Sequence, residues 1–85
     1  MIYSYDQIKQ LMKWLHITQI KMAEMLGISR QTMSKLMNDE QEMKKKHFLA
    51  MTYVLDKYMD EHSIEHSLKD GVLRVKMTKI ELFSF

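Results

Sequence analysis

The sequence contains no cysteine, no proline and only two glycines. Without cysteine the chain can form neither a disulfide nor a thiolate metal site, which fits a reducing cytoplasm. Two glycines are too few for a glycine-rich loop that cradles phosphate. No apolar run approaches the roughly 18 residues that a membrane span requires, and no signal peptide precedes the first predicted helix. We therefore expect a cytoplasmic protein with no membrane partner and no cofactor.

Size and charge set further bounds. A chain of 85 residues can form one small core, which is marginal alone and is often supplemented by oligomerisation. Its ten methionines make that core adaptable rather than sharply specified. Residues 1–46 carry eight Lys and Arg against five Asp and Glu, whereas residues 47–85 carry five against six. The net charge of +2 is weak evidence for a polyanionic partner, but the positive excess lies in the first half.

Residues 18–38 have the pattern of two short helices joined at a glycine. Thr18 and Ser29 each stand where a side-chain oxygen can cap the start of a helix. Gly27 lies where a left-handed residue would end the first helix without strain. The apolar positions fall on one side of each helix: Met22, Ala23 and Leu26 in the first, Met33 and Leu36 in the second.

The opposite side of the second helix is polar and carries no carboxylate. Its residues are Arg30, Gln31, Ser34, Lys35 and Asn38. This polar row suits contact with base edges and phosphates. A helix that binds a protein would normally present an aromatic or aliphatic anchor there.

This pattern resembles the helix-turn-helix of the lambdoid phage repressor and Cro-like family, often called XRE-like. The resemblance runs without a gap from Gln19 to Asn38, with Ala23 at the fifth place, Gly27 at the ninth and the apolar Ile28 at the tenth. It covers residues 5–60 loosely and does not reach the tail. It implies a sequence-specific DNA-binding transcriptional regulator, a homodimeric repressor that reads a pseudo-palindromic operator through the major groove.

Site residues follow from the resemblance, position by position. The recognition helix would span residues 29–37, with Arg30, Gln31 and Lys35 as base readers and Ser34 as a fourth. Gln19 and Asn38 match places that grip phosphate, and the loop after the recognition helix runs near the DNA backbone in this family. Arg30 stands where the family often has glutamine, which leaves the favoured base open. The complete expected DNA-binding set is Thr18, Gln19, Ser29, Arg30, Gln31, Thr32, Ser34, Lys35, Asn38, Lys44 and Lys45.

Two flanking helices complete the predicted bundle. Residues 5–16 carry an apolar stripe of Ile8, Leu11, Met12 and Leu15. Residues 43–61, which follow an acidic loop, carry a second stripe of Phe48, Met51, Leu55, Tyr58 and Met59. Leu49 and Tyr53 point elsewhere, toward a partner or the tail. The sequence thus predicts a mainly α, compact four-helix bundle, with a helix-turn-helix DNA-binding domain over residues 1–61.

The tail, residues 62–85, reads as a C-terminal β-hairpin or long strand. Asp70-Gly71 between alternating runs predicts a two-residue hairpin loop. That register places Leu68 opposite Leu73, His66 opposite Val75 and Ile64 opposite Met77. On the other face it places Ser67 opposite Arg74 and Glu65 opposite Lys76.

The end of the tail suggests an interface. Ile80, Leu82, Phe83 and Phe85 are expected to have no partner strand within the chain, and a long unpaired apolar edge favours pairing with a second copy. The expected dimerisation residues are Val75, Met77, Ile80, Leu82 and Phe83. Dimerisation through Leu49 and Tyr53 is the alternative.

Two other functions compete with DNA binding. His62-Ser63-Ile64-Glu65-His66 matches the residue order of inverted zinc proteases, but that motif needs a helix and a further ligand, and this segment alternates like a strand. We therefore expect no metal, no catalytic residue, no small-molecule substrate and no enzyme activity. The other rival is a protein-interaction module, such as an antitoxin or inhibitor, that uses the same fold to bind a protein.

Overall fold

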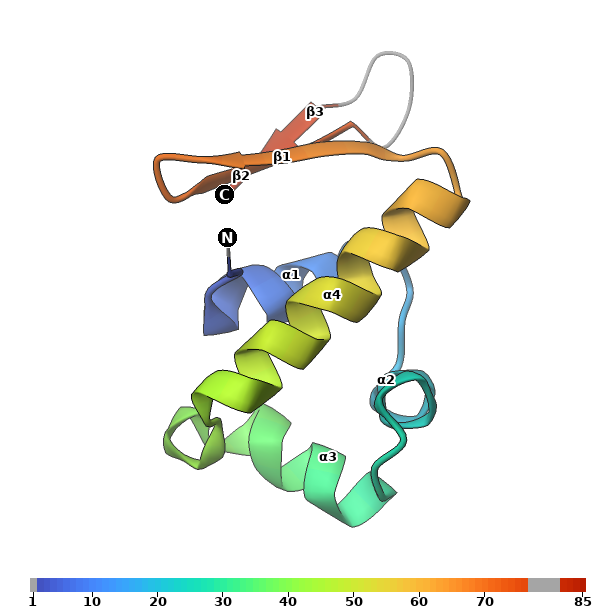
Figure 1. The fold of residues 1–85 in the computed structure, drawn as a ribbon, viewed down its shortest axis with the longest axis vertical. Helices are drawn as coiled ribbons and strands as arrows, with labels where there is room; N and C mark the ends of the chain where they lie inside the picture. Colours follow the sequence, from blue (N-terminus) through green and yellow to red (C-terminus); the bar gives the residue numbers. More distant parts are fainter. Residues whose placement is uncertain (1, 77–81) are drawn as a thin grey trace.

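Helices make up most of the chain, and a small antiparallel sheet lies across one end of them (Figure 1). The computed structural model describes residues 2–76 and 82–85, with the backbone alone for 82 and 83. The elements in chain order are α1 (Tyr5–Trp14), α2 (Gln19–Leu26), α3 (Arg30–Asn38), the 3-10 helix η1 (Glu40–Glu42), α4 (Lys45–Glu61), β1 (Glu65–Lys69), β2 (Val72–Lys76) and β3 (Leu82–Ser84). The prediction of a mainly helical bundle followed by a hairpin is confirmed.

Two helices are shorter than the sequence predicted. α1 ends at Trp14 instead of residue 16, because His16 takes a left-handed conformation with a φ of 56°. α4 begins at Lys45 instead of residue 43, because the acidic segment forms η1 and Met43 stays extended. The side chain of Asp39 starts η1 by accepting a hydrogen bond from the Gln41 amide at 3.0 Å. Short polar side chains favour such local caps over continuation of a helix.

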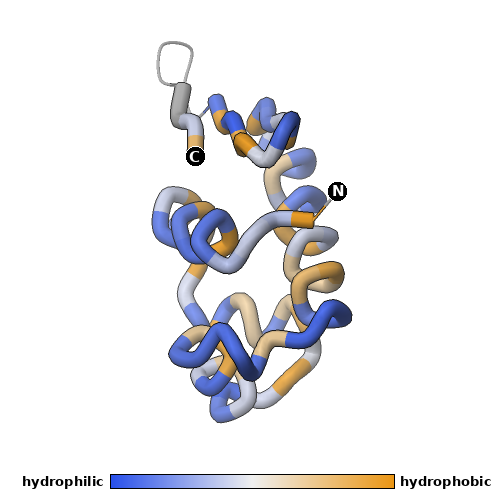
Figure 2. The backbone as a smooth tube through the Cα atoms, turned by 90° about the vertical axis from the view of Figure 1, so that its left-hand side faces the viewer, coloured by the Kyte–Doolittle hydropathy of each residue, from blue (hydrophilic) through white to orange (hydrophobic). Residues whose placement is uncertain are grey.

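The predicted apolar stripes form the centre of the core. Orange and blue alternate along the helices in Figure 2, as expected where each helix buries one side. The completely buried side chains of the helices are Ile8, Leu11, Met22, Met33, Met51 and Leu55, together with Met59. Tyr3, Ile17, Met37 and Met43 are also buried, although the sequence pattern did not single them out. Three of these four, Tyr3, Ile17 and Met43, lie outside any helix, where periodicity gives no signal.

One buried glutamine joins the first helix to the last strand. Ser4 and Gln7 form a capping box, in which the Gln7 amide donates to Ser4 Oγ at 3.2 Å and Gln7 Oε1 accepts from the Ser4 amide at 2.9 Å. Gln7 Nε2 donates to the carbonyl oxygens of Gly71 and Phe85, both at 2.9 Å. A side chain of this kind is buried without penalty because its oxygen and both N–H groups are satisfied.

The hairpin has the predicted register. Asp70 and Gly71 have φ values of 53° and 77°, which is the combination that a two-residue type I′ turn requires. The paired residues are Glu65 with Lys76, His66 with Val75, Ser67 with Arg74, Leu68 with Leu73 and Lys69 with Val72. Leu73 and Val75 are completely buried, so the predicted apolar face packs on the helices. The predicted pairing of Ile64 with Met77 involves a residue outside the described ranges.

The expectation of an unpaired C-terminal strand is wrong. β3 pairs antiparallel with β2, placing Phe83 opposite Val75 and Leu82 opposite Lys76. The amides and carbonyls of Phe85 and Leu73 exchange hydrogen bonds of 2.6 and 2.8 Å. The chain therefore covers the free edge of β2 itself, and the sheet order is β1-β2-β3.

This pairing also changes the basis of the dimer prediction. Val75 is completely buried within its own chain and does not reach the surface for a second copy. Leu82 lies, like Phe83, in a paired strand, while Met77 and Ile80 lie outside the described residues. The ring of Phe85 meets that of Trp14 edge-on, with centroids 4.3 Å apart. The tail thus ends on the helical core.

Neighbouring residues of β2 provide a test of this shared core. Leu73→Ala should lower the free energy of unfolding by about 2–5 kcal/mol, because it leaves a cavity in a fully buried site. Val72→Ala, at a position 40% exposed, should cost less than about 1 kcal/mol. Urea unfolding followed by helical circular dichroism measures both. If both variants lowered the stability of the helices by the same small amount, the sheet would not support the helices.

Candidate nucleic-acid interface

The turn between α2 and α3 is built as the sequence predicted. Thr18 Oγ1 accepts a hydrogen bond from the Lys21 amide at 3.1 Å, which caps the start of α2. Gly27 is left-handed, with a φ of 72°, and its amide donates to Glu24 O at 3.2 Å. The amide of Ile28 donates to Ala23 O at 3.0 Å, which completes a Schellman motif. The Thr18 cap and the Schellman motif therefore fix where α2 begins and where it ends.

Ser29 caps the start of α3. Its Oγ accepts from the Thr32 amide at 3.1 Å and donates to Thr32 Oγ1 at 2.9 Å. At the other end of the helix, the hydroxyl of Tyr5 donates to Met37 O at 2.6 Å. A carbonyl in the last turn of a helix has no partner within that helix, so this bond satisfies it and ties α3 to α1. Sequence reasoning missed Tyr5, because a long-range bond from a tyrosine leaves no local pattern.

Packing decides which side of α3 faces outward. Met33, Leu36 and Met37 are buried against the core, next to Met22 and Ala23 of α2. Arg30, Gln31, Lys35 and Asn38 are exposed, and Ser34 is half-buried. The Asn38 amide donates to Ser34 Oγ at 3.2 Å, which orders two members of the row. Among the described residues, neither Arg30 nor Lys35 forms an ion pair, so both cations can meet a ligand.

The electrostatic boundary of this face lies at the end of α3. Gln31, Ser34, Lys35 and Asn38 line an open hollow together with Asp39 and Glu42. α3 itself contributes no carboxylate, but these two acids follow it directly. A polyanion would thus be attracted near Arg30 and Lys35 and repelled beyond Asn38.

A second group of cations lies at the start of α4. Lys44, Lys45 and Lys46 are all exposed. The Lys44 amide donates to His47 Nδ1 at 2.9 Å. Burial, reinforced by the charges of Lys46 and Lys44, lowers the pKa of His47, which suits its role as a neutral acceptor. Three like charges at a helix N-terminus oppose the helix dipole, so their local positive potential is not neutralised there.

The predicted DNA-binding residues gather at one end of the molecule. Figure 1 places α2, α3, η1 and the start of α4 at the end opposite the sheet. Thr18, Gln19 and Thr32 are exposed there with the polar row of α3. His62 and His66, by contrast, lie after α4 and in β1, so the two histidines do not share a helix face. Within the described residues, no three His, Asp or Glu side chains are placed to hold a metal ion.

The capped helix pair and its polar outer face define a helix-turn-helix protein of the DNA-binding type. A family model described as Helix-turn-helix matches residues 8–61, from within α1 to the end of α4. The chain therefore belongs to the helix-turn-helix family, as an XRE-like member. No curated protein and no solved structure matched the chain. Within the described residues, no helix is long and apolar enough to cross a membrane.

Gly27 tests the turn. No atom lies within 4 Å of a Cβ built at this position, so any cost of substitution comes from the left-handed backbone. Gly27→Ala should lower the free energy of unfolding by about 1–2 kcal/mol. Gly27→Val should cost more because of its β-branch, and Gly27→Asn less, because asparagine tolerates this conformation. Thermal unfolding ranks the three variants. Identical melting temperatures would contradict the proposed role of the turn.

Proposed function

We propose that this protein is a homodimeric repressor that reads a pseudo-palindromic DNA operator with α3. At family level the chain is a DNA-binding transcription regulator. The observation that carries the finer proposal is the row of exposed, carboxylate-free polar side chains on α3, held outward by the buried methionines behind it. A helix of this width fits the major groove of B-DNA, where each base pair presents a distinct pattern of donors and acceptors.

The roles of individual residues follow from their positions. Arg30 and Gln31 stand in the first turn of α3, where residues of a recognition helix meet base edges. Arginine pairs with guanine O6 and N7, and glutamine with adenine N6 and N7. Lys35 extends the row by one helical turn. Asn38, at the end of the row, matches a family place that grips phosphate and would offer a neutral amide donor there.

Phosphate contacts would flank the reading helix. Thr18 and Gln19 present the start of α2, whose free amides and dipole favour an anion. Ser29 and Thr32 do the same at the start of α3. Lys44 and Lys45 supply the positive charge at the start of α4. Together these groups would hold the domain in register while the row on α3 reads the sequence.

Two variants separate the two kinds of contact. Arg30→Ala should cost about 1–3 kcal/mol on the preferred site and relax the choice at one base pair. Asn38→Ala should weaken binding to all sequences alike and leave the salt slope unchanged, because a neutral amide releases no counterion. Selection from random DNA followed by titration at several salt concentrations measures both effects.

The control for these variants is Lys69→Ala, on the hairpin at the far end of the molecule. It removes one positive charge without touching the proposed interface. Selectivity that survives in Arg30→Ala would remove Arg30 from the readers. A loss in Lys69→Ala equal to that in Arg30→Ala would mean that only overall charge matters.

The dimer needs a surface other than β2. Leu49 and Tyr53 are 46% and 66% exposed on α4, one helical turn apart. Their side of α4 lies opposite the stripe that enters the core, so a second copy could cover them without disturbing the fold. A two-fold axis would then present two copies of α3 to one operator, with half-sites about 34 Å apart.

Replacing the exposed apolar residues Leu49 and Tyr53 by charged ones tests the proposed dimer interface. Leu49→Glu with Tyr53→Glu should give a monomer in sedimentation velocity, with an unchanged helical spectrum. Its affinity for the intact operator should fall while a single half-site is bound as before. The control is Val72→Glu, which alters another exposed apolar residue, on the sheet. A double variant that still sediments as a dimer at micromolar concentration would rule out this surface.

The same exposed pair also supports a second function, binding to a protein partner. Two large apolar residues on a solvated helix are typical anchors of an interface. The tail does not support this alternative, because it packs on the core of its own chain. Binding to random DNA discriminates the two, since a DNA-binding protein shows steep salt dependence and a protein-binding module does not.

A further inference from the structure

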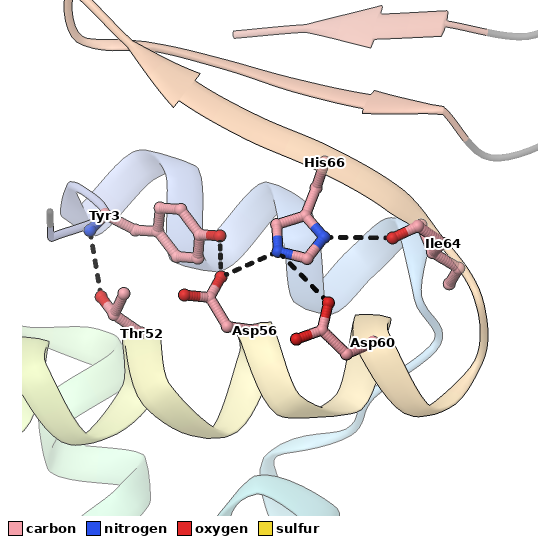
Figure 3. Close-up of polar contacts among 6 residues, drawn as sticks. All are labelled: Tyr3, Thr52, Asp56, Asp60, Ile64 and His66. Carbon is pink, nitrogen blue, oxygen red and sulfur yellow. Dashed lines mark hydrogen bonds and ion pairs between the residues drawn. The ribbon is translucent and has the colours of Figure 1, made fainter.

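Four ionisable side chains from three separate segments meet between β1 and α4 (Figure 3). They are Tyr3 before α1, Asp56 and Asp60 on α4, and His66 on β1. The side chain of His66 is only 15% exposed, whereas those of Asp56 and Asp60 are 43% and 74% exposed. The cluster lies at the opposite end of the molecule from α3 and plays no part in the proposed DNA interface.

Each nitrogen of His66 faces an oxygen atom. Nδ1 lies 3.0 Å from the carbonyl oxygen of Ile64. Nε2 lies 3.3 Å from Asp56 Oδ1 and 3.9 Å from Asp60 Oδ1. Asp56 Oδ1 also accepts a hydrogen bond from the hydroxyl of Tyr3. The backbone amide of Tyr3 donates to Thr52 Oγ1 at 3.0 Å, which fixes the tyrosine on the same helix.

Counting protons at these contacts distinguishes the forms of the imidazole. A carbonyl oxygen and a carboxylate can only accept, so each needs an N–H group opposite it. A neutral imidazole has one N–H, and either tautomer would therefore turn a nitrogen lone pair toward an oxygen. The imidazolium has two and satisfies both contacts. We propose that His66 is a proton-dependent clasp, whose imidazolium joins the hairpin to the carboxylates of α4 and releases them when it is neutral.

The surroundings of the ring support the charged form. α4 ends at Glu61, so Asp56 and Asp60 lie near its negative end, where a cation is favoured. Tyr3 stays neutral and acts as a donor, because burial and its hydrogen bond to Asp56 raise its pKa. Opposite His66, β2 presents the apolar Val75. The adjacent Glu65 points to the other face of the sheet, toward Lys76 at 3.9 Å.

The sign of the pH dependence follows. The folded protein holds this proton by contacts that the unfolded chain lacks. The added stability is therefore present in acid, where the imidazole carries both protons, and is lost in base, where it carries one. A histidine buried as the neutral base would behave in the opposite way. Because the clasp secures the hairpin, its release should loosen the sheet and leave α2 and α3 intact.

A double-mutant cycle of His66→Gln and Asp56→Asn tests the proposal. Urea unfolding of the full chain would be measured at about pH 5.5 and about pH 8.5, on either side of the ordinary titration of histidine. At the lower pH each single variant should reduce the folding equilibrium constant about two- to fivefold, and the double variant no more than either alone. At the higher pH the coupling between the two positions should vanish.

The matched control is His62→Gln. His62 stacks on Tyr58 and contacts the Tyr58 carbonyl with Nδ1, but among the described residues it forms no ion pair. Its effect on stability should simply add to that of Asp56→Asn at both pH values, in contrast to the coupling expected for His66→Gln in acid. A deficit in His66→Gln that is equal at both pH values, or an absence of coupling to Asp56 in acid, would overturn the proposal. DNA affinity of the folded variants should equal that of the wild type under either result, so the function of α3 is judged separately.

Discussion

Burial of one apolar core by residues from both ends of the chain is the constraint on which the structure depends. The helices alone leave one end of that core open, and Leu73 and Val75 of β2 close it. A chain of this size buries little apolar surface, so the loss of any part of the core is costly. The sheet that completes the core is therefore part of the stable unit. Gln7 strengthens the same junction through its two bonds to the ends of the sheet.

The polar face of α3 is a product of that core. Met33, Leu36 and Met37 enter it and therefore fix the rotation of the helix about its own axis. The left-handed Gly27 and the caps at Thr18 and Ser29 fix the angle at which the helix leaves α2. The side chains proposed to read DNA make few contacts with the protein. The buried residues on the opposite side of α3 hold them in position.

Charge is distributed unevenly over the molecule. The end that holds α3 carries Arg30, Lys35 and the three lysines that begin α4, but Asp39 and Glu42 border the polar row directly. Attraction of a polyanion is thus confined to part of the surface, which favours one docking orientation over non-specific association. At the other end the carboxylates of Asp56 and Asp60 are engaged with His66 and Tyr3.

The sequence alone determined the local structure. Apolar spacing located the helices, small polar residues located their caps, and Gly27 and Asp70-Gly71 located two turns, because each depends on neighbours within a few residues. The same spacing identified the outward row of α3, because the side of a helix opposite its buried side must face solvent. Helix ends near residues 16 and 43 were misplaced by two residues, where a left-handed residue and a 3-10 turn compete with the helix.

Only the tertiary structure decided the long-range contacts. The pairing of β3 with β2 could not be predicted. The alternation of apolar and polar residues fails beyond Thr78, and local sequence does not specify which strand another strand pairs with. The bonds from Tyr5 to Met37 and from Gln7 to Phe85 join residues 32 and 78 positions apart. The meeting of His66 with Asp56 and Tyr3 has the same origin. Such contacts depend on how whole elements pack, and packing is set by the shape of the entire core rather than by any one segment.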